Sequence, residues 1–253
     1  MTQRDWTDLT DSVRVCHSAL YATASTVVSR PGSNEVLLVD PAWVPSELAG
    51  LATDLTDAGL TVAAGFSTHA HHDHLLWHPG FGASPRYASP GATALAERER
   101  PALLTALGPG WPTELTDLLG RVSATDTLEP WGELVIHNAH STGHAALWVP
   151  DDRVLLAGDM LSDLELPLLQ ETGFAAYDAG LTALRPYVER AAIVVPGHGS
   201  PTGAPMERWL ADRRYLDALA AGTDADDERL ANPDMPQAHA ANLTAVAESR
   251  PAE

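Results

Sequence analysis

The stretch FSTHAHHDHLLWHPG, residues 66–80, contains five histidines and one aspartate between Phe66 and His78. Imidazole and carboxylate groups at this density are typical of metal sites. The apolar run LTVAAGFST, residues 60–68, predicts a buried strand, so the cluster begins where a strand ends. We expect the cluster to lie on a loop between that strand and a helix.

The spacing within the cluster indicates which side chains can share an ion. Side chains two residues apart in an extended segment point the same way, so His69 and His71 can bind one ion while His72 points elsewhere. Asp73 and His74 follow where we expect the helix to begin, and a helix N-terminus favours a carboxylate. These two residues can face a second ion.

Alternating strand and helix patterns continue along the chain. Polar residues follow three apolar strands, in the sequences THAHHDH, GDM and GHG, and loops at strand ends converge on one edge of a layered fold. Gly158 and Gly197 precede two of these polar residues and are expected to give the backbone room for tight turns. The expected strands are 12–17, 22–29, 35–40, 60–68, short strands within 121–149, 153–160 and 191–199, and the expected helices are 45–59, within 89–120, 174–190, near 205–220 and at the C-terminus.

Four separated motifs resemble those of the metallo-β-lactamase-fold hydrolase superfamily. They are the H-x-H-x-D-H pattern of residues 69–74, His144 in STGHAALWV, Asp159 in LLAGDM and His198 in VVPGHG. The resemblance spans about residues 12–200 and implies an α/β fold, a four-layer αββα sandwich of two mixed β-sheets flanked by helices. We expect a single domain over residues 1–253, with a helical C-terminal segment from about residue 204.

The resemblance also implies a set of ligands for two Zn²⁺ ions per chain, with Fe or Mn as the alternative metals. His140 is the one serious competitor of His144, but His144 better fits the glycine turn between two strands. The implied ligands are His69, His71 and His144 for one ion, Asp73, His74 and His198 for the other, and Asp159 as the bridge between them.

Hydrolysis is the reaction that this ligand set implies. Metal coordination lowers the pKa of water from about 15.7 to about 7, so a hydroxide bridging the ions could cleave a small ester, lactone, thioester or amide. Asp73 would be the catalytic residue that holds or shuttles the proton of the nucleophile. The alternatives are a mononuclear iron dioxygenase of sulfur compounds with the same fold and a non-catalytic metal-binding module.

Other residues near the motifs have less specific interpretations. The bridging Asp159 is typical of the broad hydrolase branch of the family, whereas true β-lactamases usually have another residue there. His72 and His78 are expected to be bystanders, and Trp77, Phe81 and Trp111 either line a pocket or belong to the core. Substrate choice should depend on residues 76–131, 161–176 and the C-terminal segment, which contain no motif for a particular chemical group.

Composition limits the possible partners of the chain. The net charge of -19 and the scattering of 15 basic residues, all arginine, argue against nucleic acid. No run of 18 apolar residues is present, the first residues do not resemble a signal peptide, and Cys16 is the only cysteine. We expect a cytoplasmic enzyme with a small-molecule substrate and without a membrane partner, and the sequence leaves its oligomeric state open.

Overall fold

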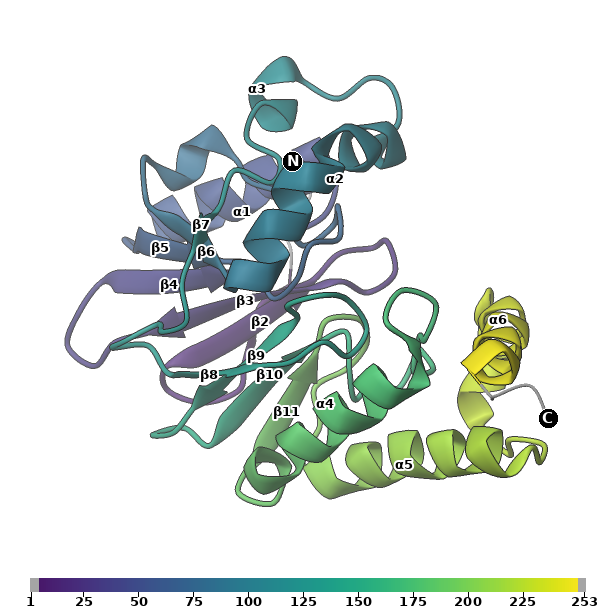
Figure 1. Ribbon diagram of the computed structural model, residues 1–253. Coiled ribbons are helices and arrows are strands. Elements are labelled where there is room, and N and C mark those ends of the chain that lie inside the picture. Colours follow the sequence, from purple (N-terminus) through teal and green to yellow (C-terminus); the bar gives the residue numbers. More distant parts are fainter. Residues whose placement is uncertain (1–4, 250–253) are drawn as a thin grey trace.

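A computed structural model describes residues 5–249 as two β-sheets packed face to face between layers of helices (Figure 1). The first sheet is antiparallel from β1 to β4 and parallel from β4 to β7. Its strands, in spatial order, are β1 (Thr7–Asp8), β2 (Val13–His17), β3 (Ala24–Ser29), β4 (Glu35–Val39), β5 (Thr61–Phe66), β6 (Arg86–Ala88) and β7 (Ser123–Ala124).

The second sheet is also mixed. Strand β9 is antiparallel to both β8 and β10, whereas β10 and β11 are parallel. The strands lie in the order β11 (Ile193–Pro196), β10 (Val154–Gly158), β9 (Ala145–Val149) and β8 (Glu133–Ile136).

Strand β4 shows how one apolar run supplies two cores. Successive side chains of a strand point to opposite faces, so a strand covered on both faces is apolar throughout. Leu37 packs between the sheets with Leu147 and Leu156, whereas Leu38 packs beneath the helices with Leu48. The predicted four-layer αββα sandwich is therefore confirmed.

Helices lie over the outer face of each sheet (Figure 1), and three α-helices contribute side chains to each of the two cores beneath them. On α1 the buried residues Leu48, Leu51 and Leu55 recur at helical spacing, and each such burial contributes about 1.5–3 kcal/mol. The first layer comprises α1 (Pro45–Asp57), α2 (Pro90–Leu107) and α3 (Thr113–Thr116), and the second comprises α4 (Gly173–Val188), α5 (Pro205–Ala221) and α6 (Met235–Ser249), with the short 3₁₀ helices η1 (Pro79–Phe81) and η2 (Glu228–Ala231).

The segment after the histidine cluster differs from the expectation. Asp73 lies in a turn in which the N–H of His74 donates to the carbonyl of His71 at 3.2 Å, and the next element is η1. His78 is extended because the following Pro79 disfavours the helical conformation at that position. The prediction of a helix beginning at Asp73 was wrong, so the helix dipole does not explain this carboxylate.

The aromatic residues near the cluster belong to the core. Trp77 and Phe81 are buried in the helix-covered core of the first sheet, and Trp111 packs against it. These three residues were expected either to line a pocket or to belong to the core, and the structure supports the core. Among residues 5–249, no helix combines the length and the apolarity needed to cross a membrane.

Candidate metal centre

Loops from both sheets meet at one edge of the sandwich (Figure 1). One loop follows β5, a second joins β8 to β9, and two more follow β10 and β11. The predicted convergence of polar strand ends is thus observed. The buried and half-buried histidines and aspartates on these loops form two adjacent groups, each able to hold a metal ion.

The first group consists of His69, His71, His140 and Asp159, whose potential ligand atoms lie within 4.8 Å of one another. Nδ1 of His71 is 3.0 Å from Nε2 of His69 and 3.1 Å from Nε2 of His140. The prediction that His69 and His71 point to the same place therefore agrees with the geometry.

The second group consists of Asp73, His74 and His198. Nε2 of His74 is 3.3 Å from Nε2 of His198, which is 3.2 Å from Oδ2 of Asp73. Asp159 lies between the groups, with Oδ1 3.2 Å from Nε2 of His74 and Oδ2 3.3 Å from Nε2 of His69. This is the place predicted for a bridging carboxylate.

His144 is the one predicted ligand that the structure does not bring into either group. Its Nε2 accepts the backbone N–H of Asp159 at 3.1 Å, so the lone pair that a metal would need is already engaged. The ring stacks between His69 and His137. His140 occupies the position that the sequence analysis gave to His144, and His144 instead supports Asp159.

Two of the clustered rings are oriented by carboxylates on their outer side. Nδ1 of His74 lies 2.9 Å from Oδ2 of buried Asp40, and Nε2 of His71 lies 2.7 Å from Oε1 of Glu171. An ionised carboxylate only accepts hydrogen bonds, so in each neutral ring the outer nitrogen bears the proton. The inner nitrogen then presents a lone pair to the cluster.

Of the other three rings, those of His69 and His198 follow the same rule, whereas Nδ1 of His140 has no hydrogen-bond partner among the described residues. Thr68 Oγ1 donates to Asp40 at 2.7 Å, which leaves it to accept from Nδ1 of His69 at 3.0 Å. Nδ1 of His198 lies 3.1 Å from the carbonyl oxygen of Tyr21, which can only accept. Inner lone pairs therefore face one another at about 3 Å, an arrangement that repels unless a cation lies between them.

Protonation of some of these rings also reduces the repulsion between the inner lone pairs. Burial disfavours the charged form of His198, but Asp159 and Asp73 outweigh it and raise the pKa of His198 to about 11. The same balance raises the pKa of His74 well above its usual range, while burial holds that of His69 well below it. The residues present fit a divalent cation, which would displace these protons.

Two glycines give the centre its backbone room, as predicted. A Cβ on Gly197 would collide with Oδ1 of Asp159, and one on Gly158, whose φ is +55°, would collide with the ring of His144. Any larger residue at either position would push a site side chain out of place.

The loop that bears His140 is pressed against the start of α2. A Cβ on Gly91 would lie 2.8 Å from the Cα of Gly143, and Gly143 has a φ of +74°. The hydroxyl of Ser89, which caps α2, donates to the carbonyl of Gly143. The N-terminus of α2 and the His140 loop therefore form one packed unit.

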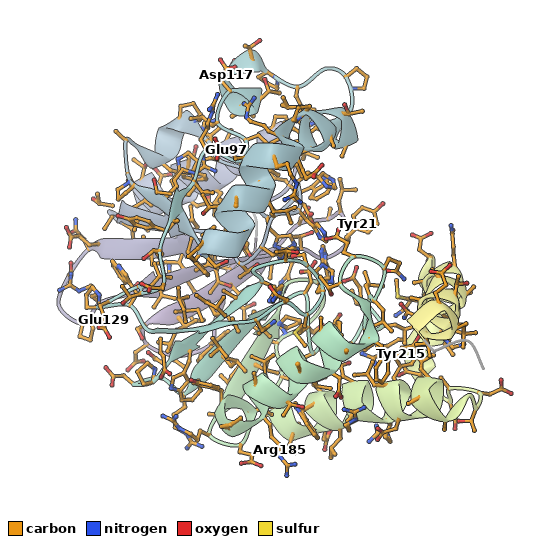
Figure 2. The ribbon with its side chains drawn as sticks, in the orientation of Figure 1. Tyr21, Glu97, Asp117, Glu129, Arg185 and Tyr215 are labelled. Carbon is orange, nitrogen blue, oxygen red and sulfur yellow. The ribbon has the colours of Figure 1, made fainter. Side chains whose placement is uncertain are left out.

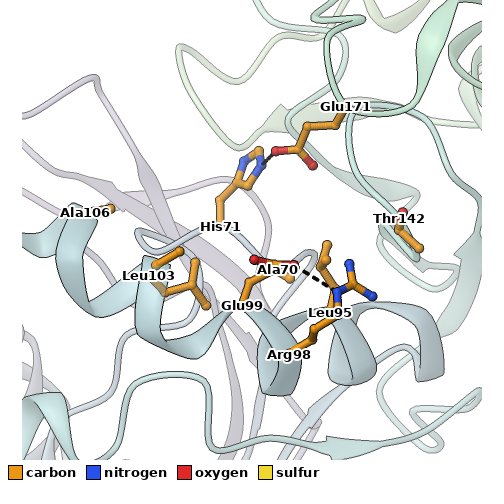
Figure 3. A pocket seen from close by; sticks show the side chains of 10 residues that line it. Ala70, His71, Leu95, Arg98, Glu99, Leu103, Ala106, Thr142 and Glu171 are labelled. Carbon is orange, nitrogen blue, oxygen red and sulfur yellow. Dashed lines mark hydrogen bonds and ion pairs between the residues drawn. The ribbon is translucent and has the colours of Figure 1, made fainter.

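A cavity of about 450 Å³ opens beside His71 (Figure 3). Helix α2 supplies most of its wall, including the apolar Leu95, Ala102 and Leu103. Glu171, hydrogen-bonded to His71, lies on the opposite side of the cavity (Figure 3). The cavity therefore joins an apolar wall to the edge of the first histidine group.

No role was expected for the residues that orient the rings, chiefly Asp40, Thr68 and Glu171. Asp40 carried a usable signal, because EVLLVD is an apolar strand ending in a carboxylate, as LLAGD is. Glu171 follows no strand and has no such signal. The expected bystanders lie outside both groups: His78 caps η1, and His72 packs on Trp43 with its Nδ1 3.9 Å from Asp73.

Solved structures of similar fold include a metallo-beta-lactamase from Pontibacter korlensis, 20% identical, with a TM-score of 0.62, covering 85% of this chain and 99% of its own. A beta-lactamase domain protein from Burkholderia ambifaria is 20% identical, with a TM-score of 0.63 and coverages of 86% and 74%. The sec-alkylsulfatase Pisa1 from Pseudomonas sp. is 14% identical, with a TM-score of 0.63 and coverages of 87% and 42%. The sequence model of the metallo-beta-lactamase superfamily matches residues 20–198, and the chain belongs to that superfamily.

Proposed function

We propose that the protein is a metal-dependent hydrolase that holds two divalent ions, zinc in the first instance, and cleaves a small ester, lactone, thioester or amide. The observation that carries the proposal is the orientation of the rings of His69, His71, His74 and His198. Acceptors on the outer side of each ring direct its free lone pair to the cluster. A purely structural histidine cluster has no need of this arrangement.

The second group favours two ions over one. Asp73, His74 and His198 are all in place, and Asp159 reaches both groups. The mononuclear alternative would leave this second set of buried donors without a cation. Protein purified without added metal should therefore contain zinc rather than a single iron per chain.

Two bound ions would supply an activated hydroxide and the positive charge that stabilises the developing oxyanion. Asp73 directs Oδ2 to His74 and His198, and its Oδ1, 3.9 Å from Nδ1 of His72, would hold the proton of the nucleophile. His144 accepts the backbone N–H of Asp159. Asp40 and Glu171 hold the rings of His74 and His71 in their orientation. The proposed catalytic role of Asp73 rests on this arrangement.

A hydrolysis screen of zinc-loaded protein tests the proposal directly. The panel consists of esters, lactones, thioesters, amides, phosphodiesters and β-lactams, and we expect turnover of at least one acyl compound. Asp159→Ala should abolish it, because this carboxylate contacts both groups. Turnover that survives removal of metal by a chelator would refute the metal-dependent mechanism.

The cavity beside His71 should accept an apolar arm of the substrate. Each CH₂ group buried there contributes about 0.8 kcal/mol, so kcat/KM should rise about fourfold per methylene until the cavity is full. Ala102→Trp places a bulky ring in the cavity from an exposed helix position and should flatten that rise while short substrates react normally. Glu97→Trp, on α2 but outside the cavity lining, is the control and should leave the chain-length series unchanged (Figure 2).

A further inference from the structure

Glu165 is an acidic side chain that no motif predicts and that lies at the edge of the metal centre. A carboxylate oxygen of Glu165 lies within 4.8 Å of donor atoms of Asp159 and His198, and these three residues form a third group able to hold a metal. Within residues 5–249, no arginine or lysine forms an ion pair with this carboxylate. A half-buried acid therefore faces the centre beside His198 and has no arginine partner.

The backbone of Glu165 forms hydrogen bonds with a residue of its own loop and with a residue of η2. Its N–H donates to Oγ of Ser162 at 3.0 Å, and its carbonyl accepts from Nη1 of Arg229 at 3.0 Å. Arg229 is held in turn by buried Asp212, with 2.6 Å between Nη1 and Oδ1. The carboxylate thus projects from a rigid turn.

Helix α6 fastens the next residues of the same loop. Asn242 donates to the carbonyl of Pro167 at 2.6 Å and accepts the N–H of Leu169 at 3.0 Å. Asn242 is fully buried, so each of these bonds forms out of water, where a lost partner is costly. Residues that lie beyond the family match at 20–198 therefore build the loop that presents Glu165.

We propose that Glu165 is an additional oxygen ligand of the ion that Asp159 and His198 would hold. This inference rests on the proposed metal centre. With Asp73, Asp159 and Glu165, the centre offers three carboxylates, and carboxylate oxygens favour Mn²⁺ and Fe²⁺ more than a purely imidazole set does. Glu165 therefore shifts the selectivity of one of the two sites towards oxygen-preferring metals.

Metal titration of Glu165→Gln, with Zn²⁺ and separately with Mn²⁺ against a competing chelator, tests this assignment. The neutral amide keeps the shape of the side chain but is a poorer ligand, so one of the two ions should bind at least about tenfold more weakly, and Mn²⁺ should lose more than Zn²⁺. The absorption spectrum of the Co²⁺-loaded variant should change, because a donor leaves the coordination sphere. Glu165→Asp, which shortens the reach by one methylene, should weaken binding as well.

Glu248→Gln, an exposed glutamate of α6, is the matched control and should bind both ions as the parent protein does. If the parent binds two ions and Glu165→Gln binds them with unchanged affinity and an unchanged Co²⁺ spectrum, the assignment is wrong, whatever happens to turnover. A variant with normal metal binding and lower kcat/KM only for cationic substrates would make Glu165 a substrate contact. If the parent itself binds no metal, the proposed function fails together with this inference.

Discussion

His140→Gln should lose the first ion and lower hydrolysis on the order of 10²–10³-fold, the cost of losing one major electrostatic stabiliser of a transition state. Nε2 of His140 is 3.1 Å from Nδ1 of His71 and 3.3 Å from Asp159, within the first group. A glutamine amide is not among the side chains that bind Zn²⁺ well. Metal content by mass spectrometry and kcat/KM on the substrate found by the screen measure the two effects.

His144→Gln is the matched variant and should behave differently. Its amide oxygen can still accept the N–H of Asp159, which Nε2 of His144 accepts at 3.1 Å in the parent. We expect two ions per chain and a loss of activity within about tenfold, the lower end of the range for groups that support a metal ligand. If His144→Gln loses an ion while His140→Gln keeps both, the ligand assignment must be reversed.

Arg229→Ala should lower the free energy of unfolding by about 3–5 kcal/mol, because removal of one partner of a buried ion pair leaves the other charge uncompensated. The side chain of Arg229 is 6% exposed and that of Asp212 is 0% exposed. Arg229 also donates to the carbonyls of Ser162 and Glu165, so the loop beside the centre should loosen. Chemical denaturation of the metal-free protein measures the change.

The pH dependence of this variant identifies its cause. Burial already raises the pKa of Asp212, against the influence of Arg229, and without Arg229 the pKa should rise further. A carboxyl whose pKa is raised in the folded state favours folding when protonated, so the stability of the variant should fall as the pH rises above about 4. Arg98→Ala, which breaks the exposed pair with Glu99 on α2 (Figure 3), should cost less than about 1 kcal/mol. An equal loss in both variants would contradict the role of burial.

The architecture was predictable from the sequence because each layer has its own hydrophobic period. The run VLLV of β4 is apolar throughout since both faces of its sheet are covered, and Leu48, Leu51 and Leu55 recur at helical spacing. The helix expected after the histidines failed because Leu75, Leu76 and Trp77 are all buried as an irregular segment before Pro79. Helical propensity is a weak prior against such tertiary packing.

Six of the seven predicted ligands come together because strand ends on one edge of a layered fold must converge. The choice between His140 and His144 could not be made in this way. It depends on a left-handed backbone at His140, with φ +65°, and on which ring accepts the N–H of Asp159. Glu165 was beyond prediction for a similar reason, since α6 and η2 determine where its loop lies.

The contact between Gly91 and Gly143 has a consequence for how the cavity beside His71 could change its specificity. Because Ser89 and Gly91 attach the start of α2 to the His140 loop, that end of the helix cannot move without disturbing the loop. The middle of α2, around Leu95 and Ala102, lines the cavity and is free of this constraint. Selection for altered specificity should therefore accumulate changes from the second turn of α2 onward and leave its first turn invariant.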